Sequence, residues 1–211
     1  MHLTDGVLTL PIAAATTAAA GAVLVYSLKG IKEEEIPKLS LMTGAFFAVS
    51  LISIPIGPSS VHPMLGGLMG ILLGRRAPAA FLVALLLHAV LLQHGGLTTL
   101  GVNTLLLALP ALAAHRIFYG IKRGSVFYRG ALVGGLAVAG TVGLLVLVLL
   151  LSDPRFGEGF FSVVNMLILG HLPLLGIEIL LTGFAVRLLY HARPHLFQAP
   201  AGQINRNNPT T

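Results

Sequence analysis

The sequence has no cysteine and few charged residues, and both shortages narrow what the chain can be. Without cysteine it can form no disulfide, thiolate metal site or thiol nucleophile, so its eight histidines are the main soft metal ligands. Charged residues make up 9% of the 211 positions, hydrophobic residues make up 55%, and the mean hydropathy is +0.91. This composition is not that of a water-soluble globule and predicts an integral membrane protein.

Acidic residues are also scarce, with 7 Asp and Glu against 13 Lys and Arg. The basic excess does not indicate a nucleic-acid partner, because the basic residues form short clusters between apolar runs, as in membrane topology. We expect seven apolar runs to be membrane-spanning helices in an all-α bundle. They cover 11–28, 41–56, 63–74, 78–93, 104–118, 130–151 and 162–190.

The third run is too short to cross a bilayer alone. Its twelve residues would extend roughly 18 Å as a helix, whereas the hydrocarbon core is about 30 Å thick. Non-helical backbone is tolerated at membrane depth only inside protein or beside a polar cavity, so we expect 57–62 to dip into the bundle. We also expect Ser59 and Ser60 to cap a helix that begins at Pro63. Glycines at every fourth position of this run predict a close-packed face: Gly66, Gly70 and Gly74.

The distribution of Lys and Arg supports seven crossings with the N-terminus outside and the C-terminus inside. In that arrangement twelve of the thirteen basic residues face the cytoplasm, and only Arg155 lies outside. Omitting the short third run would scatter the clusters over both sides. We therefore expect residues 1–197 to form one transmembrane domain and the polar residues 198–211 to form a disordered tail.

The N-terminus offers a metal chelate. No basic n-region precedes the first apolar run, so we expect the chain to keep its terminal amine. The amine of Met1, the next amide nitrogen and the ring of His2 can close two fused chelate rings on one ion. This planar nitrogen set suits Ni(II), Cu(II) or low-spin Co(II), whose in-plane bonds offset the loss of the amide proton. The alternative is a frayed terminus with no ligand role.

The nitrogen of one more imidazole would complete a square-planar set of four ligands. His62 is the candidate, because the arrangement with seven crossings places it on the outer side of the membrane together with His2. The alternative for His62 is a polar residue near the lipid headgroups. His94 is a further candidate, either as an additional ligand or as a group that holds the ligands in place, and Asn103 in the same polar stretch has the second role. Asp5 is expected in a turn that folds the terminus back into the bundle.

Three polar residues lie inside the apolar runs. We interpret His88 as a buried histidine with hydrogen-bond partners. Glu178 is the only carboxylate well inside a run, and we expect it to hydrogen-bond within the bundle or to contact a partner. His171 shares its helical face but lies about 10 Å away along the axis, which is too far for direct pairing.

Motifs along the whole bundle carry a family resemblance. They are Met1-His2-x-x-Asp5-Gly6, then Ser60-Val61-His62 with Leu65-Gly66-Gly67, then Gly95-Gly96-Leu97-Thr98-x-Leu100-Gly101-x-Asn103, then His171-Leu172-Pro173-Leu174 with Ile177-Glu178. In order and spacing they resemble the substrate-binding membrane subunits CbiM and NikM of energy-coupling-factor transporters for cobalt and nickel. The resemblance covers residues 1 to about 197, with Leu3 and Thr4 where the family commonly has Ile-Pro.

The resemblance implies a seven-helix membrane subunit of a prokaryotic cytoplasmic membrane that binds Co(II) or Ni(II) at its outer face through Met1, His2 and His62. It implies no catalysis by this chain. ATP hydrolysis is expected in a cytoplasmic ATPase pair like CbiO or NikO, which acts with a T-component membrane protein like CbiQ or NikQ. A small CbiN- or NikN-like subunit often takes part. Cobalt and nickel are not distinguished, because both accept this nitrogen set.

Two other functions are compatible with the composition. An intramembrane zinc hydrolase would use His88, His94 and Glu178, although the sequence lacks the His-Glu-x-x-His spacing of such enzymes. A purely structural membrane subunit would use its histidines only for hydrogen bonds at the membrane interface.

Overall fold

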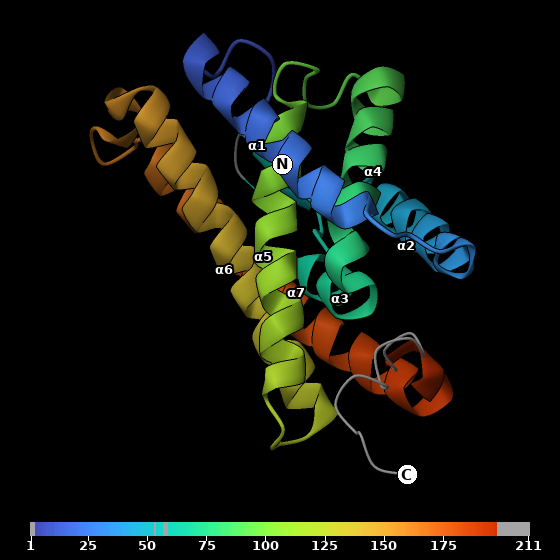
Figure 1. The fold of residues 1–211 in the computed structure, drawn as a ribbon. Coiled ribbons are helices and arrows are strands. Elements are labelled where there is room, and N and C mark those ends of the chain that lie inside the picture. Colours follow the sequence, from blue (N-terminus) through green and yellow to red (C-terminus); the bar gives the residue numbers. More distant parts are fainter. Residues whose placement is uncertain (1–2, 53, 57–58, 198–211) are drawn as a thin grey trace.

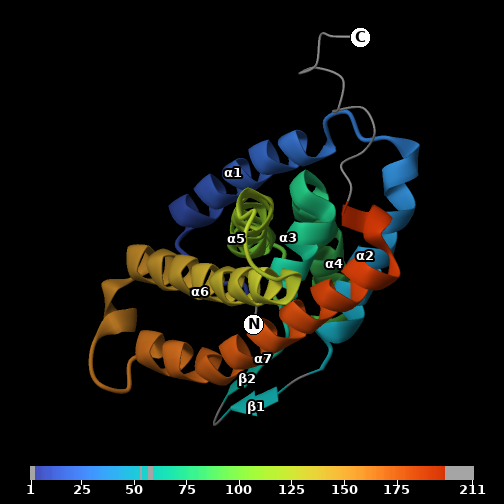
Figure 2. The ribbon, with the colours of Figure 1, turned by 90° about the horizontal axis from the view of Figure 1, so that it is seen from below.

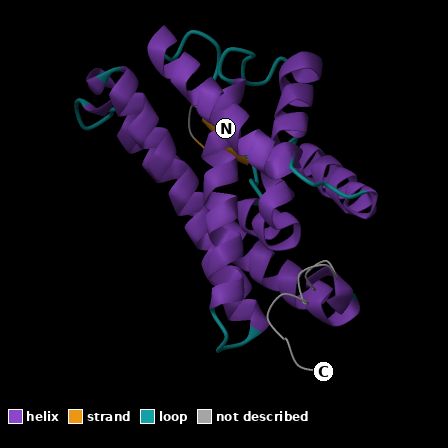
Figure 3. Ribbon diagram, viewed as in Figure 1, coloured by secondary structure: helices purple, strands orange, loops and turns teal. Residues whose placement is uncertain are grey.

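The computed structural model describes residues 3–52, 54–56 and 59–197, and helices dominate this part of the chain (Figures 1 and 3). The α-helices are α1 (Leu10–Leu28), α2 (Ile36–Val49), α3 (Gly66–Leu73), α4 (Ala77–Leu92), α5 (Leu100–Gly120), α6 (Val126–Ser152) and α7 (Val163–Ala192). Short 3-10 helices are η1 (Glu33–Glu35), η2 (Gly74–Arg76), η3 (Pro154–Gly157) and η4 (Pro194–Phe197). The expected tail, 198–211, lies outside the described residues.

Five of the predicted helical runs agree with α1, α4, α5, α6 and α7 to within four residues at either end. The prediction of a helix over 41–56 was wrong at its end, because α2 stops at Val49 and residues 54–56 form strand β1 (Ile54–Ile56). This strand pairs antiparallel with β2 (Ser59–Val61), with Ile54 opposite Val61. Pro55 explains the difference, since proline in a helix interior removes a main-chain hydrogen bond and clashes with the preceding turn.

The start of the third helix was also predicted wrongly. Ser59 and Ser60 belong to strand β2, and α3 begins at Gly66 rather than at Pro63. The residue before it, Leu65, has left-handed backbone angles (φ 49°) and gives α3 no side-chain cap. Of the segment 57–62 that we expected to dip into the bundle, residues 57 and 58 lie outside the described residues, whereas Val61 and His62 are buried. The burial continues without helix through residue 65.

The bundle is organised around α5, which packs against α1, α3, α4 and α6. Seen end-on in Figure 2, α5 lies between α1, α3 and α6, and α6 and α7 pack along each other. Of the glycines predicted to form a close-packed face, Gly66 lies against Ala137 of α6 and Gly70 against α5, whereas Gly74 lies beyond the end of α3, in η2. A Cβ on Gly70 would lie 2.1 Å from the backbone oxygen of Ala111 in α5, so only glycine permits this approach.

The connections gather at two ends of the bundle. At the first, which we call the amino-terminal end, the N–H of Thr9 donates to the hydroxyl of Ser152 at 3.0 Å. At the opposite end, Lys38 of α2 donates to the backbone oxygen of Leu196 in η4 at 2.9 Å. The contacts of Arg76 with the segment after α1 lie at this opposite end.

Five helical stretches of the described residues are long and apolar enough to cross a membrane, in agreement with the expected multi-pass helical membrane protein. They are Leu10–Leu28, Gly66–Leu92, Leu100–Gly120, Val126–Ser152 and Val163–Ala192. The 14 residues of α2 are too few for this criterion, and α3 and α4 are joined into one stretch by η2. Seven crossings therefore remain a prediction.

Candidate metal-binding site

His62 stands at the point where the chain turns from β2 into α3, and only 5% of its surface is exposed. Its Nδ1 lies 3.0 Å from the backbone oxygen of Pro63. Because a carbonyl only accepts, Nδ1 must carry the proton, and Nε2 is then the nitrogen with the lone pair. Burial disfavours the charged form of this imidazole. The ring is therefore neutral at pH 7, the form that binds metals.

Met1 and His2, the other two predicted ligands, lie outside the described residues. The residue that follows them, Leu3, is held by its main chain. Its N–H donates to Oδ1 of Asn103 at 2.9 Å, and its carbonyl accepts from Nδ2 of the same side chain at 2.9 Å and from Thr99 Oγ1 at 2.6 Å. Asn103 is 4% exposed and sits in the first turn of α5. We call this set of contacts the Leu3 clamp.

Asp5 supplies a second attachment of the N-terminal segment. Its Oδ1 accepts from the main-chain N–H of Thr98 at 2.9 Å and also from the hydroxyl of that residue. These hydrogen bonds from Thr98 hold the pKa of Asp5 below its usual value, so the carboxylate is ionised. A Cβ on Gly96 would lie 2.1 Å from Oδ1, so the loop needs glycine there. Asp5 thus lies in a turn, as expected, and touches the α4–α5 loop.

His88 and His94 differ in their surroundings. His88 is 2% exposed, its Nε2 lies 2.9 Å from the hydroxyl of Ser50, and its ring stacks on Phe47 at 4.6 Å between centroids. It therefore joins α4 to the end of α2, in line with a buried histidine that has hydrogen-bond partners. His94 is exposed and its backbone N–H donates to the carbonyl of His88 at 3.1 Å.

Glu178 reaches from α7 to the segment that carries His62. Its side chain is completely buried, and Oε1 accepts from the N–H of Met64 at 2.5 Å and from the N–H of Leu65 at 2.8 Å. The carboxylate therefore does what the two serines were expected to do, which is to satisfy main-chain donors ahead of a helix. His171, two turns earlier on α7, donates from Nδ1 to the carbonyl of Leu167 at 2.6 Å.

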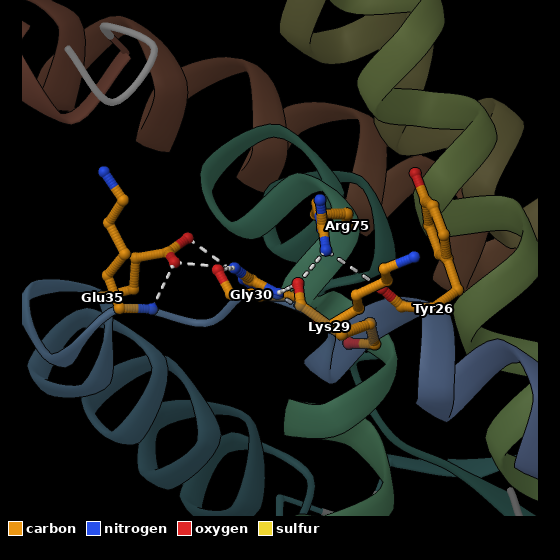
Figure 4. Close-up of polar contacts among 8 residues, drawn as sticks. Tyr26, Lys29, Gly30, Glu35 and Arg75 are labelled. Atoms are coloured by element: carbon orange, nitrogen blue, oxygen red, sulfur yellow. Dashed lines mark hydrogen bonds and ion pairs between the residues drawn. The ribbon is translucent and has the colours of Figure 1, made fainter. Parts of the chain in front are cut away.

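The opposite end of the bundle holds a polar network that sequence reasoning missed (Figure 4). Arg76 is 5% exposed and forms a two-pronged ion pair with Glu35, with 2.7 Å between Nη2 and Oε2. The same guanidinium donates to main-chain oxygens at the end of α1, including that of Gly30 at 2.8 Å. Arg75 binds the carbonyls of Tyr26 and Lys29. The sequence feature that could have predicted this network is the adjacent pair Arg75-Arg76 between two helical segments.

No group of three or more His, Cys, Asp or Glu side chains that could hold a metal occurs within residues 3–52, 54–56 and 59–197. The zinc-hydrolase alternative needs His88, His94 and Glu178 in one such group. Glu178 instead accepts hydrogen bonds from the α3 turn, and His88 is occupied by the end of α2. The arrangement does not support a hydrolytic zinc centre.

Comparisons with known proteins identify the family. The family model CbiM, described as a cobalt uptake substrate-specific transmembrane region, matches residues 2–196. The chain belongs to the CbiM family. A Haemophilus influenzae relative named for metal transport is 32% identical over 200 residues, which cover 93% of this chain and 96% of that protein. An Archaeoglobus fulgidus relative, named as a fused nickel transport protein NikMN, is 29% identical over 210 residues, or 95% and 69% of the two chains.

A solved structure of a truncated transition metal transporter has the same fold. It superposes with a TM-score of 0.73 at 22% identity and covers 90% of this chain and 99% of that one. CbiM membership confirms the resemblance found in the sequence motifs. It also establishes that the chain is a membrane component of metal uptake, in a family that transports cobalt and nickel.

Proposed function

We propose that this CbiM-family chain is the substrate-binding subunit of an energy-coupling-factor transporter, which captures Co(II) or Ni(II) at its extracytoplasmic face and delivers the ion inward. The observation that carries the proposal is the Leu3 clamp, because it fixes the main chain directly after His2 against the first turn of α5. A terminus held in this way favours a ligand role over fraying.

The ligands in this proposal are the amine of Met1, the amide and ring nitrogens of His2, and Nε2 of His62. The buried, neutral ring of His62 with its proton on Nδ1 supports this assignment. Asn103 and Asp5 then hold the terminal segment in place, and His94 is either an additional ligand or a group that holds the ligands in place. A planar set of four nitrogens matches the preference of Ni(II) and low-spin Co(II).

The proposal includes seven crossings with the N-terminus outside. Glu178, midway along α7, contacts the start of α3, whereas the joint after α3 meets the end of α1 at the opposite end of the bundle. Thus α3 occupies only part of the bundle depth, and the buried segment 61–65 and the hairpin complete the third crossing. The clustering of Lys and Arg places the Arg76 end in the cytoplasm.

The energy for transport comes from other subunits in this proposal: a T-component membrane protein like CbiQ or NikQ and a cytoplasmic ATPase pair like CbiO or NikO. A small CbiN- or NikN-like subunit is also expected, and the name of the fused NikMN relative supports it. Membrane lipid surrounds the bundle, and no nucleic acid takes part.

Calorimetric titration of the purified chain with Ni(II) and Co(II) tests the proposal. One residue added before Met1, or the change His62→Ala, should abolish binding, because each removes one nitrogen from the plane. The matched control is His191→Ala, since His191 is exposed in the last turn of α7 and bonds only to its own helix, at 2.8 Å. Unchanged affinity in the extended chain and in His62→Ala would refute the proposed site.

A further inference from the structure

Glu178 is the one fully buried carboxylate among the described residues, and it is not one of the proposed metal ligands. It projects from α7 to the turn between β2 and α3, and α7 runs beside the β1–β2 hairpin in Figure 2. Its Oε1 accepts from two consecutive main-chain donors, Met64 at 2.5 Å and Leu65 at 2.8 Å. These residues follow His62 by two and three positions.

One peptide group links Glu178 to His62. The carbonyl of Pro63 and the N–H of Met64 belong to the same planar peptide unit. The carbonyl end accepts the Nδ1 proton of His62 at 3.0 Å, while the N–H end donates to Glu178. The rigid amide plane therefore connects the carboxyl oxygen to the imidazole through two hydrogen bonds.

The turn needs such support because its own backbone is unfavourable. Leu65 has a positive φ, which residues other than glycine rarely adopt, and as the N-cap residue it gives the start of α3 no side-chain cap. Without Oε1, two N–H groups would be buried with no acceptor, and the turn would rearrange. His62 would then lose both its fixed orientation and the carbonyl that holds its proton on Nδ1.

We propose that Glu178 is a positioning residue for metal binding, which orients His62 and fixes its tautomer through the Pro63–Met64 peptide group. This inference rests on the proposed role of His62 as a ligand. Hydrogen-bonded partners of metal-binding histidines act in this way generally, and their loss typically weakens metal affinity about 10- to 100-fold. Here the hydrogen bond reaches the ring across a main-chain amide.

Two conservative variants test the proposal by calorimetry with Ni(II). Glu178→Gln keeps an acceptor at the same reach, so its Kd should stay within about threefold of wild type. Glu178→Asp keeps the carboxylate but is one methylene short, so its Kd should rise about 10- to 100-fold. The control Thr141→Val removes a buried hydroxyl that bonds to Leu106 at 3.0 Å in α5, and its Kd should not change.

Glu178→Asp binding Ni(II) as tightly as wild type, or more tightly than Glu178→Gln, would overturn the proposal, and so would an equal loss in Thr141→Val. A wild-type chain that binds neither Ni(II) nor Co(II) would refute the proposed function instead. In that case the proposed role of Glu178 is tested by the Nδ1–H resonance of His62 in ¹⁵N-histidine-labelled protein. It should be retained in Glu178→Gln and shifted or lost in Glu178→Asp, and identical spectra would overturn the proposal.

Discussion

Replacing Asn103 with leucine removes the Leu3 clamp with little change in side-chain volume. The amide of Asn103 makes two hydrogen bonds of 2.9 Å to the main chain of Leu3, one in each direction. Leucine can make neither. Of the clamp, only the hydroxyl of Thr99 then still holds the carbonyl of Leu3, and the N–H of Leu3 loses its acceptor.

The expected magnitude follows from these two bonds. Each contributes about 1 kcal/mol net, and a partly buried N–H left without an acceptor costs about 1 kcal/mol or more. The docked terminus should therefore be destabilised by about 2–3 kcal/mol, which is roughly 30- to 150-fold in the ratio of docked to undocked chains. Metal binds only the docked form in the proposed site, so we expect the Kd for Ni(II) to rise by up to the same factor, about 30- to 150-fold.

Calorimetry on Asn103→Leu, Asn103→Asp and wild type measures this effect. Asn103→Asp keeps an acceptor for the Leu3 N–H and should give an intermediate Kd. Thr104→Val is the matched control, because Thr104 is equally buried on α5 but its hydroxyl bonds within that helix, to Leu100 at 2.8 Å. A folded Asn103→Leu chain with wild-type affinity would refute the reasoning that the clamp positions the metal-binding terminus.

Three further predictions concern the loop, the opposite end and the helix packing. Gly96→Ala should displace Asp5 and weaken Ni(II) binding in the same calorimetric assay, because the new Cβ would lie 2.1 Å from the carboxylate; unchanged binding would contradict this. The hydrogen bonds from Arg76 lower the pKa of Glu35 below 4.5, so Glu35 stabilises the fold above that pH and this contribution disappears as the pH falls through the folded-state pKa. The Tm of Glu35→Gln should thus be lower than wild type at pH 6 and converge with it in acid, and a constant difference would argue against the ion pair. Gly70→Ala should lower the Tm by forcing α3 away from a backbone oxygen 2.1 Å from the new Cβ, and an unchanged Tm would show that α3 can shift freely.

Local patterns predicted the helices and the close packing of α3 well. Long apolar runs and a glycine at every fourth position are properties of contiguous sequence, and both survive in the fold because lipid and neighbouring helices impose them. The hairpin was missed because Ile54-Pro55-Ile56 is as apolar as a helix end. Only the helix-breaking property of Pro55 pointed the other way, and the prediction gave it too little weight.

Contacts between distant residues account for most of what the sequence did not reveal. The partners of Glu178 lie 113 and 114 positions away, and those of Arg76 lie 41 to 49 positions away. No periodicity encodes such pairs. A lone carboxylate in an apolar run signalled that some donor must exist, but the identity of the donor depends on how α7 crosses the turn before α3.

The clamp recognises residue 3 through its peptide atoms alone, with the donor and the acceptor both on the backbone. Interchange of Leu3 with another aliphatic residue should therefore be tolerated, whereas proline would abolish the contact, because its ring nitrogen carries no hydrogen to donate. Sequence changes at position 3 that keep the main-chain N–H should therefore leave both hydrogen bonds to Asn103 intact.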